Sequence, residues 1–272
     1  MIGRGDAGLE LVLRQLSRRG AGGFEWYKDS CLLRRIEVRM RARSVGTLTR
    51  YAALLEDDPD ELDRLLHTLS VRVTGFFRNP DTWLRLRELL ASEPVSRERG
   101  LCAWSMGCAT GEETWSIAML LLDLARGAGP DAMERVSVLG SDVDDQALAV
   151  GAAGRYATQS VVAIRAVLPH PYGAVREGWF EVDPVLRPRV EFQREDLTAP
   201  RREDGQYDLV CCRNLLIFLG REGQRRVLDA ARRALRPGGM LALGRTESLV
   251  ALPDAGLEPV DLTHRLYRGA AA

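Results

Sequence analysis

Residues 107–113, Gly-Cys-Ala-Thr-Gly-Glu-Glu, join a glycine-rich turn to two adjacent acids directly after an apolar run. Glycines let the backbone pass close to a ligand, and the helix expected next offers unpaired N–H groups at its start. Glu112 and Glu113 would repel a diphosphate there, whereas they would attract an ammonium or sulfonium group. The chain also lacks the GxxxxGK[ST] and GxGxxG phosphate motifs. The turn therefore predicts a binding site for a ligand that carries no phosphate. The alternative is an ordinary tight turn whose acids complement the helix dipole.

Acidic residues also follow two later predicted strands. Asp142 follows the strand expected at residues 136–140, where a carboxylate can accept from both hydroxyls of a ribose. Asp144 is better placed to cap the next helix. Asp196 and Leu197 follow the third strand, where they could bind an adenine amino group and cover the ring. Each acid alone is more often a solvated loop residue, but acids at successive strand ends beside a glycine turn indicate a nucleoside site.

A mainly parallel, doubly wound α/β sheet is expected to position these residues, because short apolar runs alternate with helical stretches. Such a sheet binds its ligand beyond the carboxyl ends of the strands. Residues 155–185 fit no pattern and are expected to be an insertion, which extends to residue 188 at most. The expected strands are residues 101–105, 136–140, 190–193, 207–212, 240–244 and 264–267, and the expected helices are residues 112–125, 146–153 and 221–235.

Residues 24–92 show helical periodicity instead. The polar stretch at residues 92–100 breaks this periodicity and predicts a linker. We therefore expect a helical N-terminal domain at residues 1–95 and a sheet domain at residues 96–272. Capping signals mark the starts of three helices, at Asp29-Ser30, Asp58-Pro59 and Asn79-Pro80.

The bulk composition excludes several classes of protein. The formal net charge is zero, so no global field favours nucleic acid or an anionic membrane. No apolar run reaches the roughly 18 residues that span a bilayer, and the N-terminus lacks a signal-peptide core. We therefore expect a cytoplasmic protein without membrane insertion. Five cysteines without a CxxC pair and three separated histidines predict no metal site.

A set of motifs stands in order along the chain: Phe24-Glu-x-Tyr27-Lys28, Arg34-Arg35-Ile36-x-x-Arg39-Met40, Val73-Thr74-x-Phe76-Phe77-Arg78, Thr110-Gly-Glu-Glu-x-x-Ser116-Ile117-Ala118, Ser141-Asp142-x-Asp144, Tyr207-Asp208-x-x-x-Cys212-Arg213-Asn214 and Leu235-x-Pro237-x-Gly239. In these motifs the chain resembles the CheR family of chemotaxis receptor methyltransferases, which methylate glutamate side chains on bacterial chemoreceptors. The resemblance runs over residues 24–267.

The resemblance implies a class I S-adenosylmethionine methyltransferase domain closed by a small all-helical domain. It implies methyl transfer to receptor glutamate carboxylates, with S-adenosylhomocysteine as the second product and no metal. The residues that it assigns to the cofactor are Thr74 and Arg78 from the small domain, Gly107 in the turn, Glu112 at the methionine amino group, Asp142 at the ribose, Asp196 and Leu197 at the adenine, and Arg213 and Asn214 on the floor of the transfer site. We expect Arg78 to steer the acceptor carboxylate as the catalytic residue.

A basic helix precedes these motifs, and a run of this kind is often simply a solvated face. An anionic partner is the alternative, although aromatic residues for base stacking are missing, so nucleic acid is not expected. The resemblance favours the cytoplasmic helices of chemoreceptors as the partner. The residues assigned to this contact are Lys28, Arg34, Arg35, Arg39 and Arg43.

The sequence departs from the family at three places. Arg72 replaces a usual asparagine, and Phe218 replaces a usual tyrosine whose hydroxyl faces the transfer site. Residues 180–190 form a shorter segment than in members whose β-hairpin subdomain grips a receptor pentapeptide tail, so such docking is not expected. Two alternatives stay open: a non-catalytic S-adenosylmethionine-binding signalling module, and a methyltransferase acting on another carboxylate.

Overall fold

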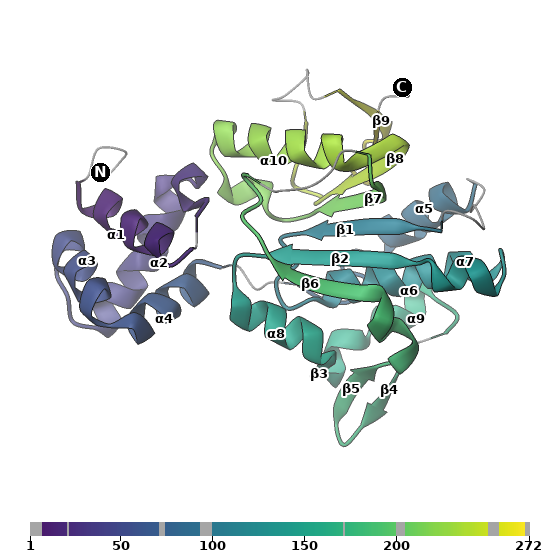
Figure 1. The fold of residues 1–272 in the computed structure, drawn as a ribbon, viewed down its shortest axis with the longest axis horizontal. Coiled ribbons are helices and arrows are strands. Elements are labelled where there is room, and N and C mark those ends of the chain that lie inside the picture. Colours follow the sequence, from purple (N-terminus) through teal and green to yellow (C-terminus); the bar gives the residue numbers. More distant parts are fainter. Residues whose placement is uncertain are drawn as a thin grey trace.

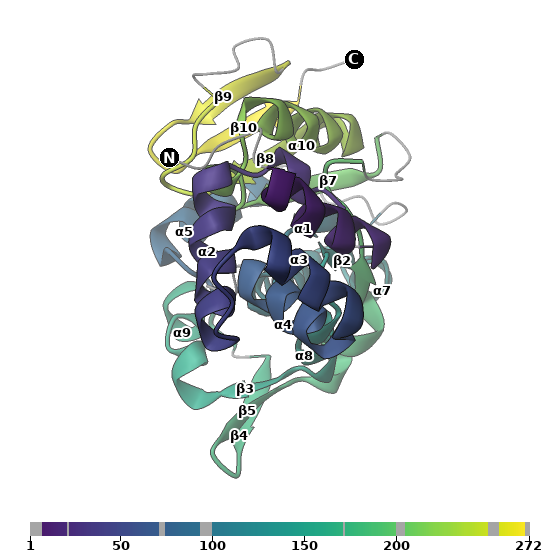
Figure 2. The ribbon, with the colours of Figure 1, turned by 90° about the vertical axis from the view of Figure 1, so that its left-hand side faces the viewer.

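The computed structural model describes residues 7–20, 22–70, 74–92, 100–170, 172–199, 205–249 and 256–269. A cluster of helices lies beside an α/β domain, and the strands β1 and β2 point toward that cluster (Figure 1). Viewed from the helical side, α1 to α4 stand in front of the sheet (Figure 2). No helix among the described residues is long and apolar enough to cross a membrane.

The helical cluster has a hydrophobic core of its own. Asp58 caps its last helix as predicted, because the carboxylate accepts from the Glu61 amide at 3.0 Å. The first helix was not predicted, although Leu9, Val12 and Leu16 form its buried stripe. The elements are α1 (Ala7–Arg18), the 3-10 turn η1 (Phe24–Trp26), α2 (Asp29–Ala42), α3 (Leu48–Asp57) and α4 (Pro59–Leu69).

The central sheet has seven strands in the order β6-β2-β1-β7-β8-β10-β9. The pairs from β6 to β8 are parallel, whereas β10 is antiparallel to both β8 and β9. The mainly parallel, doubly wound sheet is therefore confirmed. The strands are β1 (Cys102–Met106), β2 (Ser137–Asp142), β6 (Val190–Arg194), β7 (Tyr207–Cys212), β8 (Leu235–Leu243), β9 (Leu257–Asp261) and β10 (Leu266–Gly269).

Helices cover both faces of the sheet, which explains why its strands are apolar at successive positions. Ala103, Leu209 and Cys211 pack on the face that carries α5 (Pro80–Ala91) and α6 (Glu112–Arg126). Trp104 and Val210, one residue further along, pack under α10 (Arg221–Ala234) on the other face. The remaining helices of this domain are α7 (Pro130–Glu134), α8 (Asp145–Ala153) and α9 (Ile164–Val167).

The change from one core to the other does not fall at residue 95. Trp83, Leu86 and Leu90 of α5 belong to the core of the sheet domain, whereas the core of the helical cluster ends with Leu69 of α4. Of the linker predicted at residues 92–100, residues 93–99 lie outside the described residues, as do Arg72 and Val73.

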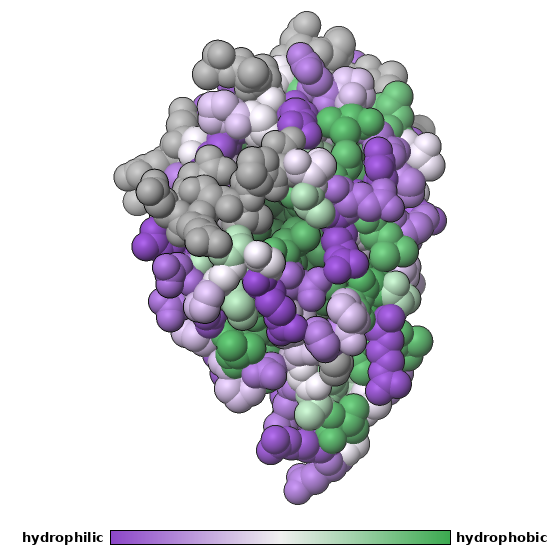
Figure 3. Space-filling model, turned by 90° about the vertical axis from the view of Figure 1, so that its right-hand side faces the viewer, coloured by the Kyte–Doolittle hydropathy of each residue, from purple (hydrophilic) through white to green (hydrophobic). Residues whose placement is uncertain are grey.

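The segment that fitted no sequence pattern forms a second, antiparallel sheet of order β3-β5-β4. Its strands span only three or four residues each, too few for a periodic signal. Figure 1 shows it projecting from the lower edge of the α/β domain. On the face opposite the helical cluster, hydrophobic residues are interspersed with hydrophilic ones (Figure 3). The elements here are β3 (Arg155–Ala157), η2 (Thr158–Val161), β4 (Gly173–Arg176), β5 (Trp179–Val182) and η3 (Pro184–Arg189).

Candidate active site

Two neighbouring cavities lie where the carboxyl ends of the strands face the helical cluster. The first, of about 40 Å³, is lined by Gly22, Gly23, Phe24, Tyr27, Gly107, Asp142, Val143, Asp196, Leu197, Thr198, Leu215, Leu219 and Val227. The second, of about 230 Å³, is lined by Thr74, Gly75, Arg78, Gly107, Cys108, Ala109, Glu113, Arg213, Asn214, Ile217 and Phe218. The structure thus brings nearly all predicted cofactor residues to one place.

Gly107 is the residue that both cavities share. Its φ of 69° is left-handed, and a Cβ there would lie 3.4 Å from Leu215 Cδ2 and 3.8 Å from Leu197 Cδ1. Glycine adopts this conformation without strain, and it adds no atom between the cavities. The predicted close approach of the turn to a ligand is therefore possible at this residue.

Asp142 ends β2 on the wall of the first cavity. Its two oxygens accept from the amides of Ala109 (2.9 Å) and Asp144 (3.1 Å). Burial raises the pKa of Asp142 in spite of these hydrogen bonds. Asp144 caps α8, as predicted, by accepting from the amides of Gln146 and Ala147. A carboxylate has about four acceptor sites, so Asp142 retains capacity for hydroxyl donors.

Asp196 lies against the helical cluster at the far end of this cavity. Its Oδ1 accepts from the amide and the hydroxyl of Thr198, at 2.9 and 2.6 Å. A Cβ at Gly23 would come within 2.5 Å of Asp196 Oδ1, and one at Gly22 within 2.9 Å of Oδ2. A side chain at either position would displace the Asp196 carboxylate, and Gly23 also has a left-handed φ of 86° that favours glycine. Leu197 lines the same wall.

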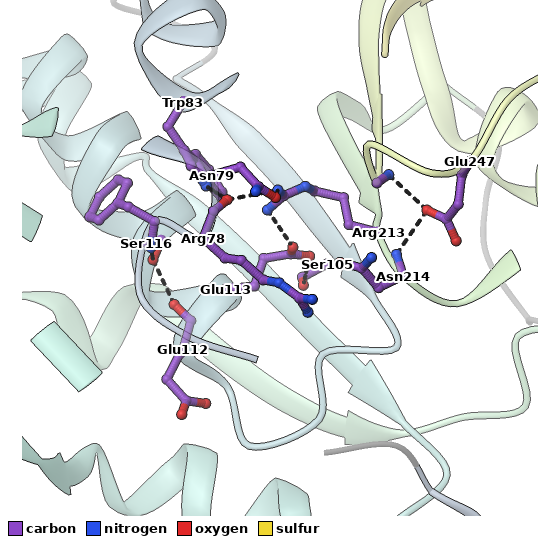
Figure 4. A network of polar contacts seen from close by, with 12 residues as sticks. Arg78, Asn79, Trp83, Ser105, Glu112, Glu113, Ser116, Arg213, Asn214 and Glu247 are labelled. Carbon is purple, nitrogen blue, oxygen red and sulfur yellow. Dashed lines mark hydrogen bonds and ion pairs between the residues drawn. The ribbon is translucent and has the colours of Figure 1, made fainter. Parts of the chain in front are cut away.

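The two acids at the start of α6 have different surroundings. Glu113 lines the second cavity, but its carboxylate accepts from Ser105 Oγ (2.9 Å) and Arg213 Nη1 (3.2 Å). The Glu112 side chain points elsewhere (Figure 4), and its Oε2 accepts from Thr110 Oγ1 at 2.7 Å. Burial raises the pKa of Glu112 against this hydrogen bond. A buried carboxylate with so little compensation is a suitable partner for an added cation.

Arg78 sits in a tight turn that other elements hold in place. Phe77 and Asn79 on either side have left-handed φ values of 45° and 63°. The Arg78 carbonyl accepts from Trp83 Nε1 (3.0 Å) and Arg213 Nη2 (2.7 Å). In Figure 4 the Arg78 guanidinium lies between Glu112 and Asn214. The sequence predicted Asn79 as a helix cap, but its side chain makes no capping bond.

Arg213 lines the second cavity and also anchors this turn. Its side chain is 3% exposed, and it donates to the Arg78 carbonyl, to Asn79 Oδ1 (3.1 Å) and to Glu113. Its guanidinium also lies 5.3 Å from the centroid of the Trp83 ring. Arg213 therefore ties the end of β7 to the turn that carries Arg78.

A main-chain seam joins the helical cluster to the loop after β7. Lys28 N donates to the Phe218 carbonyl (2.9 Å), and Gly220 N donates to the Trp26 carbonyl (2.8 Å). Lys28 Nζ donates to the Ile217 carbonyl at 2.7 Å. Lys28, which we expected to face a receptor, thus serves the contact between the domains. The Phe218 ring lines the second cavity.

The basic helix is largely occupied by contacts within the chain. Glu61, fully buried, accepts from Arg39 Nη2 at 2.6 Å, Arg43 Nη1 at 3.2 Å and Tyr51 OH at 2.7 Å. Arg35 donates to the carbonyls of Thr68 and Leu69 and lies over the Phe218 ring at 5.6 Å. The sequence correctly predicted a basic helix, but it gave no indication that an acid and two carbonyl groups on α4 would bind these arginines. Arg34 remains exposed on α2.

The residues present fit S-adenosylmethionine. The lining of the first cavity brings together an acid, a leucine and glycines, residue types that suit a nucleoside, although its 40 Å³ would have to widen to admit one. Glu112 offers a buried carboxylate at the start of α6 but lines neither cavity. No described His, Cys, Asp or Glu side chains cluster in a way that could hold a metal ion.

A mainly parallel, doubly wound sheet with cavities at the carboxyl ends of its strands, beside a helical domain, is the architecture expected for a class I methyltransferase. The profile described as "CheR methyltransferase, SAM binding domain" matches residues 72–264, and that described as "CheR methyltransferase, all-alpha domain" matches residues 7–70. The chain belongs to the CheR methyltransferase family and is an S-adenosylmethionine-dependent methyltransferase.

Curated relatives agree with this assignment. An uncharacterised 104.1 kDa protein of Rhodobacter capsulatus is 33% identical over 94% of this chain. The chemotaxis protein methyltransferases of Listeria monocytogenes and Klebsiella aerogenes are 27% and 29% identical over 93% and 89% of the chain. The chain spans 27% of the length of the Rhodobacter protein but 89% and 83% of the other two.

Proposed function

We propose that the protein transfers a methyl group from S-adenosylmethionine to glutamate side chains on the cytoplasmic helices of chemoreceptors, giving glutamate methyl esters. The observation that carries this proposal is the second cavity, which Arg78 and Gly107 both line. The printed names of the Listeria and Klebsiella relatives support chemotaxis as the setting.

The residues around this cavity suit a carboxylate acceptor. Bound S-adenosylmethionine supplies an electrophilic methyl group on a sulfonium. A glutamate is already ionised near neutral pH, with a pKa of about 4.3, so no general base is required. Arg78 is proposed to orient the acceptor carboxylate. Holding two reactants in line in this way can be worth roughly 7–11 kcal/mol of the barrier.

The cofactor roles proposed for the other residues follow from their positions. Asp142 would accept from the ribose, and Asp196 and Leu197 would contact the adenine. Glu112 would hold the methionine amino group, because its buried carboxylate has unused capacity for donors. Thr74 and Asn214 line the second cavity and would contact the methionine end.

Receptor contact is proposed for a different set of arginines from the one that the sequence suggested. Arg39 and Arg43 are held by Glu61, so charge reversal there would break an internal network before it tested receptor binding. Arg34 and Arg41 are exposed on one side of α2, about two helical turns apart. Val38, which lies between them, is 48% exposed. We propose that this ridge meets the receptor.

The test uses labelled S-adenosylmethionine and membranes that carry chemoreceptors. We expect base-labile methyl groups to enter the receptor, and we expect none in a receptor whose methylation-site glutamates are replaced by alanine. Arg78→Ala should lose most of the transfer while retaining affinity for S-adenosylhomocysteine. Arg34→Glu should slow the transfer without affecting that affinity. Methyl incorporation that resists base, or that occurs only in another protein, would refute the proposed acceptor.

A further inference from the structure

Glu247 is a buried acid that none of the recognised motifs contains. It is 3% exposed and lies just beyond the end of β8. Its Oε2 accepts from the amides of Asn214 (2.8 Å) and Gly244 (2.7 Å), and its Oε1 accepts from the amide of Leu216 (2.7 Å). Hydrogen bonds from backbone amides to a carboxylate are of the stronger, charge-assisted kind. Figure 4 shows Glu247 across from Asn214.

The loop that Glu247 holds lines both cavities. Leu215 and Leu219 line the first, whereas Asn214, Ile217 and Phe218 line the second. Leu215, which approaches Gly107, lies between the two residues whose amides bind Glu247. Asn214 itself has a left-handed φ of 63°, a conformation that costs energy and persists only where its surroundings impose it.

Gly244 shows that the chain accommodates this network closely. A Cβ at residue 244 would lie 2.6 Å from Glu247 Oε2 and 2.9 Å from the Asn214 amide nitrogen. Both distances are too short for a side chain, so only glycine lets the end of β8 approach the loop after β7 at this point.

We propose that Glu247 is a positioning residue: it fixes the loop at residues 214–219 so that its side chains form the walls of the cofactor and transfer cavities. It acts through the backbone of that loop and does not touch the reacting atoms. The inference builds on the family's methyltransferase chemistry and holds for any methyl acceptor.

Glu247→Gln is the main test. A glutamine keeps one acceptor oxygen but turns an NH₂ group toward at least one backbone amide, so at least one hydrogen bond is replaced by a donor–donor contact. We expect affinity for S-adenosylhomocysteine, measured by calorimetric titration, to fall about tenfold. We expect kcat to fall between about tenfold and a hundredfold, because small displacements of positioning groups have effects of this size.

Asp208→Asn is the matched control, since Asp208 stands near the opposite end of β7 from the loop. Its Oδ2 accepts from the Cys102 amide (2.8 Å) and from Arg236 Nη1 (2.6 Å). It therefore bridges neighbouring strands, much as Glu247 links the segments that follow β7 and β8, but it lines neither cavity. We expect Asp208→Asn to lower the melting temperature while leaving affinity for S-adenosylhomocysteine as in the unmodified protein.

Two further variants keep the test decisive if Glu247→Gln folds poorly. Glu247→Asp retains the carboxylate but shortens its reach, so its affinity should be intermediate. Gly244→Ala should weaken affinity as Glu247→Gln does, since it displaces the same network from the other side. The proposal is overturned if these variants lower only the melting temperature, as Asp208→Asn does, and bind S-adenosylhomocysteine normally. The titration needs no methyl acceptor, so failure of the proposed receptor substrate would be recognised separately.

Discussion

Replacing Arg213 should destabilise the protein more than any exposed arginine would. The Arg213 side chain is 3% exposed, and its partner Glu113 is 11% exposed. Removing one member of a buried ion pair leaves the other charge uncompensated, which costs about 3–5 kcal/mol. Arg213→Ala also removes a donor from the Arg78 carbonyl, although Trp83 still donates to it. We therefore expect a loss of roughly 3–5 kcal/mol in urea unfolding near pH 8.

The pH dependence of this loss identifies its origin. Burial raises the pKa of Glu113, while Arg213 and Ser105 act to lower it. Without Arg213 that pKa should rise further, so the folded variant takes up a proton as the pH falls and the unpaired charge disappears. The difference in stability between Arg213→Ala and the unmodified protein should thus shrink from pH 8 to pH 5.

A double variant completes the cycle. Arg213→Ala combined with Glu113→Gln removes both charges, so its loss should be smaller than the sum of the losses in Arg213→Ala and in Glu113→Gln. A loss below about 1 kcal/mol for Arg213→Ala, in the range measured for exposed ion pairs, would refute the reasoning. Additive single losses would refute it equally.

Two other predictions concern buried acids, Glu112 in cofactor binding and Glu61 in stability. Glu112→Gln should weaken binding of S-adenosylhomocysteine while preserving stability. In the unmodified protein that binding should weaken as the pH falls toward the raised pKa of Glu112, and the weakening should begin above the ordinary glutamate pKa of about 4.3. Calorimetric titrations at several pH values would contradict this prediction if the affinity were constant. Burial acts to raise the pKa of Glu61, but the hydrogen bonds from Arg39 and Tyr51 outweigh burial, so the pKa is lowered. The stabilisation that Glu61 contributes is therefore complete above its unfolded pKa of about 4.3, and it is lost as the pH falls through the lower pKa of the folded state. The fall in urea midpoint between pH 6 and pH 3 should therefore be smaller in Glu61→Gln, and an equal fall would exclude this role.

The sheet could be predicted because its strands are buried on both faces. Runs such as residues 207–212 are apolar at nearly every position, and the structure places β7 at those residues. The antiparallel strands at residues 155–157, 173–176 and 179–182 could not be predicted, because three or four residues carry no usable period. The helix predicted at residues 221–235 is observed at Arg221–Ala234, but the strand predicted at residues 240–244 begins earlier, because β8 spans Leu235–Leu243.

Partners were harder to predict than positions. The spacing of Arg39 and Arg43 places both on one side of α2, but nothing local in the sequence indicates that Glu61 of α4 lies opposite. Glu247 could have been found, because it follows a predicted strand as Asp142 does, and that signal was used only for the earlier strands. Its partners are backbone amides, which no side-chain motif records.

The seam between Trp26–Lys28 and Ile217–Gly220 has a consequence for how such proteins diversify. Its hydrogen bonds end on main-chain atoms, and only Lys28 contributes a side chain. Backbone groups are the same whatever residue carries them, so the sequence on either side of the joint can change while its register persists. We therefore expect that the helical domain can be exchanged for that of a relative, provided that glycines remain at positions 22 and 23, where a Cβ would lie too close to Asp196. A relative's helices grafted in place of residues 7–70 would meet the catalytic domain through the same amides and carbonyls, and would bring a different outer surface with them.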